Sequence, residues 1–192
     1  MSKNDRKLVN LRDIFEPIIV LQKLLTDTLE ELRAELSLSA ESQDVRLVAL
    51  DACRRILVRF GWLFGAVSIA TKEENFASWK RLIDAEPDRV IAQENMNDYL
   101  RLSVVTALHF QIDNLFGRLL SEMNDLPSGH GFRPRAGQLR DRTRSTNEEL
   151  DTLIAFTYMR NCFHNNGIHR DRELRFKAGD MEVSFIPGQA VH

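Results

Sequence analysis

The chain has 192 residues, of which 43% are hydrophobic and 28% are charged, and its formal net charge at pH 7 is −2. This composition is that of a well-packed globular domain and lies far from the disordered regime. A net charge near zero gives no global attraction to nucleic acid or to an anionic membrane, so any such affinity must be local. The two cysteines, Cys53 and Cys162, lie far apart in a chain without a secretory leader, which predicts reduced thiols in a cytoplasmic protein.

Apolar residues spaced by three and four positions predict two long helices in the first third of the chain. The first covers residues 8–36, with Pro17 near its start or at a kink. The second runs from Asp44, as its N-terminal cap, to Ala70, and it is the most hydrophobic of the predicted helices. Arginines interrupt its apolar stretch, which is shorter than the ~20 apolar residues that cross a bilayer, so no membrane partner is expected.

A short helix and a third long helix follow. Thr71-Lys72-Glu73-Glu74 is typical of a helix start and leads into a short helix that ends at Ala85. Residues 88–97 fit either a helix or a loop. From Asp98 to Met123 the apolar residues again share one helix face. On this helix Asp113 is a candidate for orienting a partner in a site, whereas a lone histidine such as His109 more often serves packing or the surface.

Proline and glycine interrupt the helical pattern over residues 124–144, so we expect a long connection there. Between positions 133 and 144 it carries five arginines and one aspartate, a local net charge of +4. Arginines beside a phosphate site would raise the affinity for an RNA backbone without preferring any base. The alternative is an ordinary solvated loop. The candidate RNA-binding residues are Arg133, Arg135, Arg140, Arg142 and Arg144.

The last predicted long helix carries the most convincing chemical group. Ser145-Thr146-Asn147-Glu148 has the capping-box pattern, in which the Ser side chain accepts from backbone N–H groups and the Glu reaches back. Asn165-Asn166-Gly167 ends the helix. Arg160 and His164 are four apart and project from one side, and a guanidinium beside an imidazole suits phosphate chemistry. The alternative is that the helix dipole favours both residues near a C-terminus and that they have no further role.

After Gly167 the apolar period changes to two. Residues 173–177 and 181–186 alternate around Ala178-Gly179-Asp180, which predicts a two-stranded hairpin that must pack on the helices to be stable. The predicted fold is therefore all-α, a bundle of four long helices and one short helix over residues 8–166, with a small C-terminal β-hairpin. The expected organisation is a helical domain at 1–172, followed by the hairpin and tail at 173–192.

Common cofactor signatures are absent from the sequence. It contains no Gly-rich phosphate loop, no Cys-x-x-Cys and no His-Glu-x-x-His. Cys162, His164, His169 and His130 could be combined as metal ligands. However, Cys162 and His164 lie two apart on a helix and face different ways, which argues against a metal site and against a Cys–His nucleophile pair. We therefore expect neither a metal nor another cofactor.

The motif Arg160-Asn161-x-x-His164-Asn165, at the end of the last long helix of an all-α bundle, resembles the HEPN superfamily. The usual signature of that family is an Arg, commonly followed by Asn, with four to six residues before a His. The resemblance covers the motif well and the bundle of residues 8–166 in general character. In this chain only three residues separate Arg160 from His164, which turns the imidazole by about 100° around an ideal helix. Asn165 occupies the place of the His in the shortest usual spacing.

The resemblance implies a two-fold homodimer in which the helices 146–166 of two protomers face one another. Many HEPN proteins are metal-independent ribonucleases of toxin–antitoxin or phage-defence systems, so RNA and an antitoxin or defence protein are the implied partners. His164 would act as general base on a ribose 2′-OH, or as acid to the leaving 5′-oxygen. Arg160 would stabilise the charge growing on the phosphate. Asn161 would orient the phosphate or cap the partner helix. Asn165, like Asp113, is a candidate orienting residue.

Other HEPN proteins are inactive binding modules, which gives the alternative function. In that case Arg160, Asn161 and His164 would hold a dimer interface or a nucleotide phosphate. The acidic net charge and the short Arg–His spacing favour this alternative, whereas the arginine-rich segment favours the nuclease.

Overall fold

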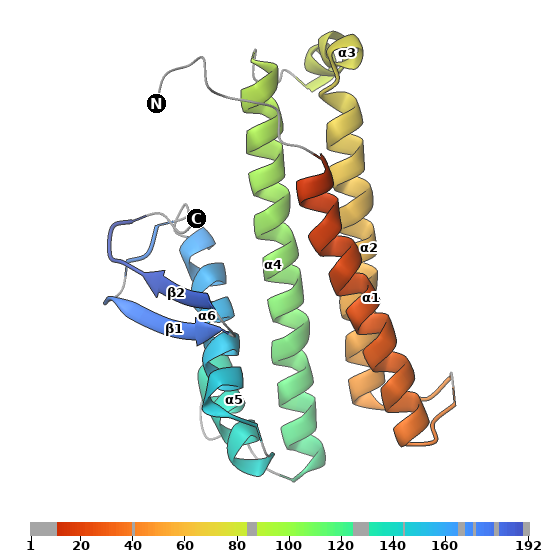
Figure 1. Cartoon of the computed structure of the whole chain (residues 1–192), viewed down its shortest axis with the longest axis vertical. Helices are drawn as coiled ribbons and strands as arrows, with labels where there is room; N and C mark the ends of the chain where they lie inside the picture. Colours follow the sequence, from red (N-terminus) through yellow and green to blue (C-terminus); the bar gives the residue numbers. More distant parts are fainter. Residues whose placement is uncertain are drawn as a thin grey trace. The chain divides into compact units, whose positions relative to one another are not determined.

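The computed structural model of the chain describes residues 11–39, 41–83, 88–124, 131–143, 145–164, 168–170, 172–178 and 181–189. Over these residues it forms six helices and two strands (Figure 1). The elements are α1 (Leu11–Glu35), α2 (Val45–Ala70), α3 (Glu73–Ile83), α4 (Arg89–Glu122), α5 (Phe132–Arg142), α6 (Asn147–His164), β1 (Leu174–Ala178) and β2 (Met181–Phe185). The prediction of a mostly helical chain with a small C-terminal hairpin is confirmed. None of the helices described combines the length and the apolar content that a membrane crossing requires.

The chain forms two compact units, residues 1–104 and 105–192, which divide within α4. In the first unit α1 and α2 run antiparallel, side by side (Figure 1). Its core contains Phe64 and Val67 from α2 and Leu100 from α4, all buried. The predicted boundary between a helical domain at 1–172 and a terminal hairpin segment stays a prediction.

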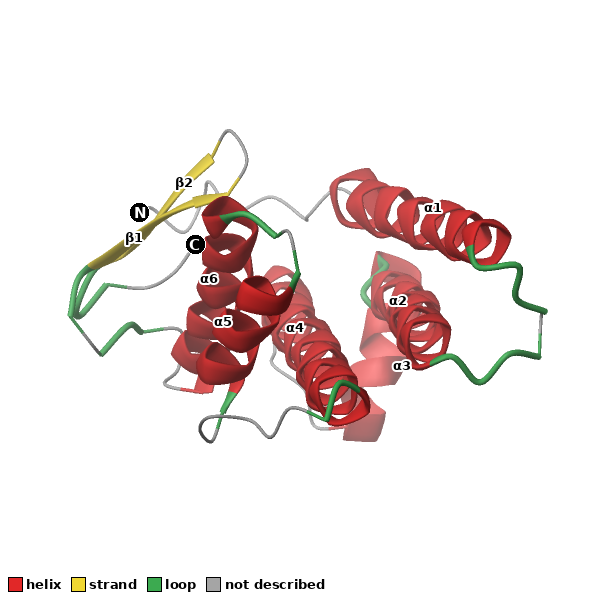
Figure 2. Ribbon diagram, turned by 90° about the horizontal axis from the view of Figure 1, so that it is seen from below, coloured by secondary structure: helices red, strands yellow, loops and turns green. Residues whose placement is uncertain are grey.

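In the second unit the hairpin lies beside α6 (Figures 1 and 2). β1 and β2 pair antiparallel, with Leu174 opposite Phe185 and Phe176 opposite Val183. Phe185 is fully buried and packs with Cys162 and other residues of α6. A two-stranded hairpin is marginally stable by itself, so α6 stabilises it by covering its apolar face.

Two aspartates start long helices. Asp44 accepts a hydrogen bond from the Arg46 backbone N–H at 2.9 Å, which confirms it as the cap of α2. The hydrogen-bonded guanidinium of Arg46 lowers the pKa of Asp44 to about 2. Asp88 accepts from the backbone N–H groups of Val90 and Ile91 at 2.9 and 3.2 Å. Of the undecided residues 88–97, Asp88 therefore precedes α4 and residues 89–97 are its first turns, continuous with the helix predicted from Asp98.

The start of α3 differs from the expectation. The Thr71 hydroxyl donates to the Val67 carbonyl at 2.8 Å, and Thr71 is the C-terminal cap of α2. The Lys72 carbonyl instead accepts from the N–H groups of Asn75 and Phe76, so α3 begins after Lys72. A threonine hydroxyl can form hydrogen bonds with backbone groups at either end of a helix. In the short α2–α3 connection, Thr71 bonds the last turn of α2 and does not cap α3.

The predicted long connection over 124–144 was wrong in its second half, because residues 132–142 form α5. Pro134 lies in the first turn of α5, where backbone N–H groups have no intrahelical partner and a proline is tolerated. Gly131 precedes the helix with a φ of 109°, a conformation that favours glycine. Ala136 and Leu139 are buried, and this burial offsets the modest cost of a helical glycine.

The capping box of α6 is shifted by one residue from the prediction. Thr146, rather than Ser145, accepts from the Glu149 backbone N–H at 3.2 Å, and Glu149, rather than Glu148, accepts from the Thr146 N–H at 2.7 Å. The sequence Ser-Thr-Asn-Glu-Glu contains two overlapping capping boxes, and the α5–α6 connection selects the second. The helix ends at His164, and the predicted terminator, residues 165–167, lies outside the described residues.

Candidate functional site

The predicted Arg/His motif lies in the last turns of α6. Arg160 is half-buried, and its Nη1 donates to Oδ1 of Asn161 at 2.9 Å. The Nε of Arg160 is buried without a hydrogen-bond partner in the described structure. This guanidinium therefore has one edge fixed by the chain and a donor that nothing described accepts. His164 is the last residue of α6, and its side chain, like Asn165, lies outside the described part of the chain.

A second histidine, His109 on α4, belongs to the same region. It is only 7% exposed, and its ring centroid lies 4.7 Å from that of Phe132. Its Nε2 lies 3.1 Å from Oγ1 of Thr157, whose hydroxyl donates to the Leu153 carbonyl. Because the one hydroxyl proton of Thr157 is directed to Leu153, the proton on His109 lies on Nε2 and is donated to Thr157. His109 is thus a fixed part of the contact between α4 and α6.

Burial and the nearby charge of Arg160 favour the neutral form of the His109 imidazole. Burial lowers the pKa of His109 below its ordinary value, the positive charge of Arg160 lowers it further, and the negative charge of Asp113 opposes them. The motif arginine therefore acts electrostatically on a histidine that the sequence pattern assigned to packing. In the sequence, two spacings pointed to this arrangement. His109 lies four positions before Asp113, and Thr157 lies three positions before Arg160.

Asp113 forms an ion pair with Arg135 of α5. Nη1 of Arg135 donates to Oδ1 of Asp113 at 2.8 Å, and the two side chains are 27% and 29% exposed. The Nε of Arg135 is buried and unpartnered within the described structure. Two predicted site residues are therefore brought together, but the carboxylate neutralises an arginine that was expected to meet RNA.

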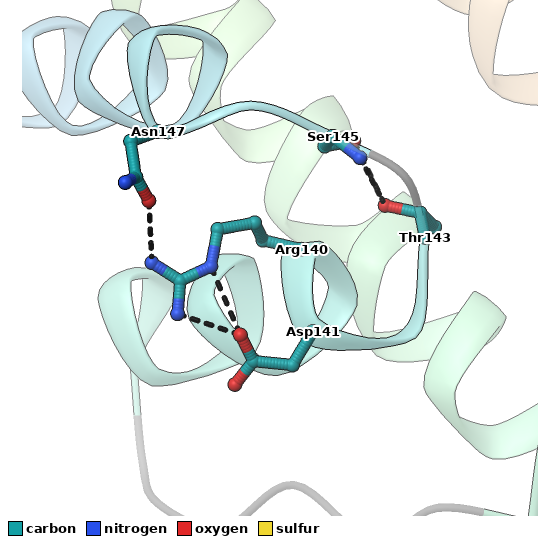
Figure 3. Close-up of polar contacts among 5 residues, drawn as sticks. All are labelled: Arg140, Asp141, Thr143, Ser145 and Asn147. Atoms are coloured by element: carbon teal, nitrogen blue, oxygen red, sulfur yellow. Dashed lines mark hydrogen bonds and ion pairs between the residues drawn. The ribbon is translucent and has the colours of Figure 1, made fainter.

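The other arginines of the predicted RNA-binding segment differ in their surroundings. Arg140 donates through Nε and Nη2 to one oxygen of Asp141, at 2.9 and 2.6 Å, and through Nη1 to Asn147 at 3.0 Å (Figure 3). Arg133 and Arg142 are exposed near the two ends of α5. Arg144 lies outside the described residues.

An apolar cavity of about 460 Å³ lies between α4, α5 and α6. Its polar lining residues include Arg140 of α5 and Ser145 of the connection between α5 and α6, both labelled in Figure 3. The size is within the range of small-ligand pockets. No sequence motif announces it, because its walls are residues of three helices that are separate in the chain. The cavity is lined by Phe116, Leu119, Ala136, Leu139, Arg140, Thr143, Ser145, Glu149, Leu150, Thr152 and Leu153.

The histidine beside the Cys162 thiol is His169, and both residues are buried. In the sequence, His164 was considered as the partner of Cys162, and the helical spacing argued against it. Nε2 of His169 lies 2.8 Å from the Arg172 carbonyl, which only accepts, so Nε2 carries the proton and Nδ1 is left to accept. The Cys162 thiol, 3.6 Å from Nδ1, is the matching donor. The backbone of His169 also bonds Gly188 and Gln189, so this pair ties the tail to α6.

Within the described residues, no group of three His, Cys, Asp or Glu side chains is arranged to hold a metal ion. Of the histidines considered for such a site, His130 and the side chain of His164 lie outside that description. What the second unit does bring together is the neutral His109 with the charges of Arg160 and Asp113, and Asp113 with Arg135. Comparisons of the chain with protein-family models, with curated proteins and with solved structures found no match.

Proposed function

We propose that the chain is a HEPN-like, metal-independent endoribonuclease of a toxin–antitoxin or phage-defence system. The ribose 2′-oxygen attacks the neighbouring phosphorus, and the bond from phosphorus to the 5′-oxygen breaks. A base takes the 2′-OH proton and an acid gives a proton to the 5′-oxygen. The products are a 2′,3′-cyclic phosphate and a free 5′-OH.

The placement of the Arg160 guanidinium is the main support for the proposal. Its guanidinium is held by Asn161 in the last turns of α6, and its buried Nε has no acceptor in the described structure. A guanidinium that is held in place and partly exposed suits the extra negative charge of a phosphate in the transition state, where preorganised donors contribute most. His109 beside it is neutral and does not compete with phosphate for the positive charge.

In this mechanism His164 is the general base or acid. His109 does not take that role, because it is 7% exposed and its Nε2–H is bonded to Thr157. A single catalytic histidine leaves the second proton transfer without a group, and a two-fold dimer that pairs the two α6 helices supplies it.

The second candidate function is a non-catalytic binding module, and the ion pairs of the arginines favour it. Arg135 is paired with Asp113 and Arg140 with Asp141, so these two cations contribute less to RNA binding than the sequence suggests. In this alternative Arg160 holds a phosphate without catalysing its transfer.

The deciding experiment compares purified wild type with His164→Ala and Arg160→Ala on total RNA in the presence of EDTA. Each variant is expected to lose ~10²–10⁴-fold in cleavage rate while keeping the wild-type melting temperature. His192→Ala, a histidine of the tail, is the control and should cleave at the wild-type rate. Equal cleavage by wild type and His164→Ala would refute the catalytic assignment. No cleavage by any of the proteins would favour the binding module.

A further inference from the structure

α2 presents an apolar surface to water in the first unit. Trp62 is 80% exposed, and Leu63 and Ile69 are 47% and 59% exposed. An indole that becomes fully buried removes roughly 150–250 Å² from water, so leaving one in solvent forgoes a large hydrophobic contribution. Adjoining exposed apolar side chains of this kind mark interaction sites.

The exposed residues form one continuous stripe along α2. Arg55, Arg59, Trp62, Ala66 and Ile69 are spaced by four, three, four and three positions, and all five are exposed. This spacing puts them on one face of the helix, over about 21 Å of its length. We call these five residues the α2 stripe. The other side of α2 carries the core residues Phe64 and Val67.

The two ends of the α2 stripe differ in charge. Three arginines, Arg54, Arg55 and Arg59, lie at its N-terminal end, and Asp51 pairs with the first two of them. The side chain of Arg55 is still 55% exposed in that pair. Beyond the C-terminal end lie exposed Glu73 and Glu74 in the first turn of α3, with Lys72 before them. The surface is therefore basic at one end, apolar in the middle and acidic at the other end.

We propose that the α2 stripe binds the α2 stripe of a second copy of this chain in an antiparallel, two-fold contact. An axis at the level of Phe64 sets Trp62 opposite the partner's Ala66, so that each large indole covers a small side chain. The antiparallel arrangement also brings the basic end of each stripe toward the end of the partner's α2, after which the first turn of the partner's α3 carries Glu73 and Glu74. A two-fold axis places the basic end of one copy against the acidic end of the other, so the surface is complementary to itself. This charge complementarity favours a second copy over an unrelated partner.

The contact is independent of the proposed function and uses a different surface from the predicted pairing of α6. If both contacts form, the chain assembles beyond a dimer, because each protomer then has two different two-fold surfaces. If only the α2 contact forms, the chain is a dimer of about twice 22.1 kDa.

Charge reversal tests the contact directly by light scattering at micromolar concentration. Arg55→Glu/Arg59→Glu and Glu73→Lys/Glu74→Lys each place like charges at both ends of the contact, so each variant alone should lose the α2 contact and have a lower mass than the wild type, half of it if the α2 contact alone forms the dimer. A one-to-one mixture restores opposite charges at both ends and should regain the wild-type mass. Glu30→Lys/Glu31→Lys, an exposed acidic pair on α1, is the matched control and should keep the wild-type mass. If a double variant fails to fold, the single variant Arg59→Glu or Glu74→Lys from the same pair is used in its place.

Trp62 supplies a second measurement. In a Trp79→Phe background the only remaining tryptophan is Trp62, and its emission should shift to shorter wavelength as the concentration is raised through association. A wild type with the mass of one chain would overturn the proposal. So would charge-reversed variants that keep the wild-type mass, or a mixture that does not regain it.

Discussion

The guanidinium of Arg135 on α5 donates to the carboxylate of Asp113 on α4 at 2.8 Å, with both side chains less than one-third exposed. The sequence suggested separate roles for these residues, an orienting acid and a member of an RNA-binding segment. Their contact makes each the counter-ion of the other and fixes α5 against α4. The pair also supplies the carboxylate that acts on His109.

Breaking this pair should destabilise the protein. Asp113→Asn and Arg135→Gln each leave a half-buried charge without its partner, and the double variant removes both charges. We expect a coupling free energy of about 1 kcal/mol in a double-mutant cycle measured by urea unfolding. Arg133→Gln, an exposed arginine on the same helix, should change the free energy of unfolding by less than ~0.5 kcal/mol. A coupling energy indistinguishable from zero would show that the contact does not hold α4 and α5 together.

His109 should make the protein less stable in mild acid. Its pKa in the folded state lies below the ordinary value of 6.5, so the unfolded chain binds the proton more readily. The free energy of unfolding should therefore fall as the pH drops below about 6.5, and level off below the folded-state pKa. Each unit of pKa difference corresponds to about 1.4 kcal/mol.

His109→Gln tests this, because the Gln amide can still donate to Thr157 but does not titrate. The measurement is the difference in unfolding free energy between pH 7.5 and pH 5.5 for wild type and variant. The wild type should lose more stability than His109→Gln. The same pH dependence in both proteins would assign the effect to other groups.

Two adjacent residues at the start of α6 should differ in their contribution to stability. Thr146→Ala removes the side chain that accepts from Glu149 N–H, and should cost about 1 kcal/mol. Ser145→Ala loses only an exposed contact with Thr143 and should stay within ~0.5 kcal/mol of wild type. Thermal unfolding of the two variants decides which residue caps the helix. A larger loss of stability for Ser145→Ala would show that Ser145 caps the helix, as the sequence first suggested.

Features that depend on neighbours in the chain were predictable from the sequence. Periodicity and local capping identified α1, α2 and the hairpin, and Asp44 caps α2 as expected. The capping box of α6 was misplaced by one residue. Two overlapping boxes fit the local sequence, and which of them forms depends on the turn that leads from α5 into α6. The helix α5 was missed because Pro134 and Gly137 were interpreted as breakers, whereas one lies in a first turn and the other is tolerated.

The contacts that build the candidate site join residues far apart in the sequence. Asp113 and Arg135 are separated by 22 positions, and His109 and Thr157 by 48. No periodicity within one helix reports which residue of another helix it meets. The sequence could therefore predict Arg160 as a site residue from its local motif, but it could not predict that His109 lies in its electrostatic field.

The arginines around α5 should divide into two classes in RNA binding, if the proposed function holds. Arg133 is exposed, whereas the charge of Arg135 is already paired with Asp113. Each phosphate contact to a single strand contributes about 0.7 to the slope of log affinity against log salt concentration. Arg133→Ala should reduce that slope by about this amount and weaken binding. Arg135→Ala should change the slope much less.

The measurement is fluorescence anisotropy with a labelled single-stranded RNA over a series of salt concentrations. It is made in the His164→Ala background, so that cleavage does not remove the probe. Asp113→Asn is the complementary variant, because it releases Arg135 from its counter-ion and should steepen the salt dependence and tighten binding. In the protein with His164 intact, the single-turnover cleavage rate at saturating RNA should remain near wild type in Arg133→Ala, since this side chain is expected to contact the RNA backbone and not the reacting atoms. An equal loss of slope in Arg135→Ala would mean that RNA displaces Asp113, and the ion pair would then be part of the binding surface.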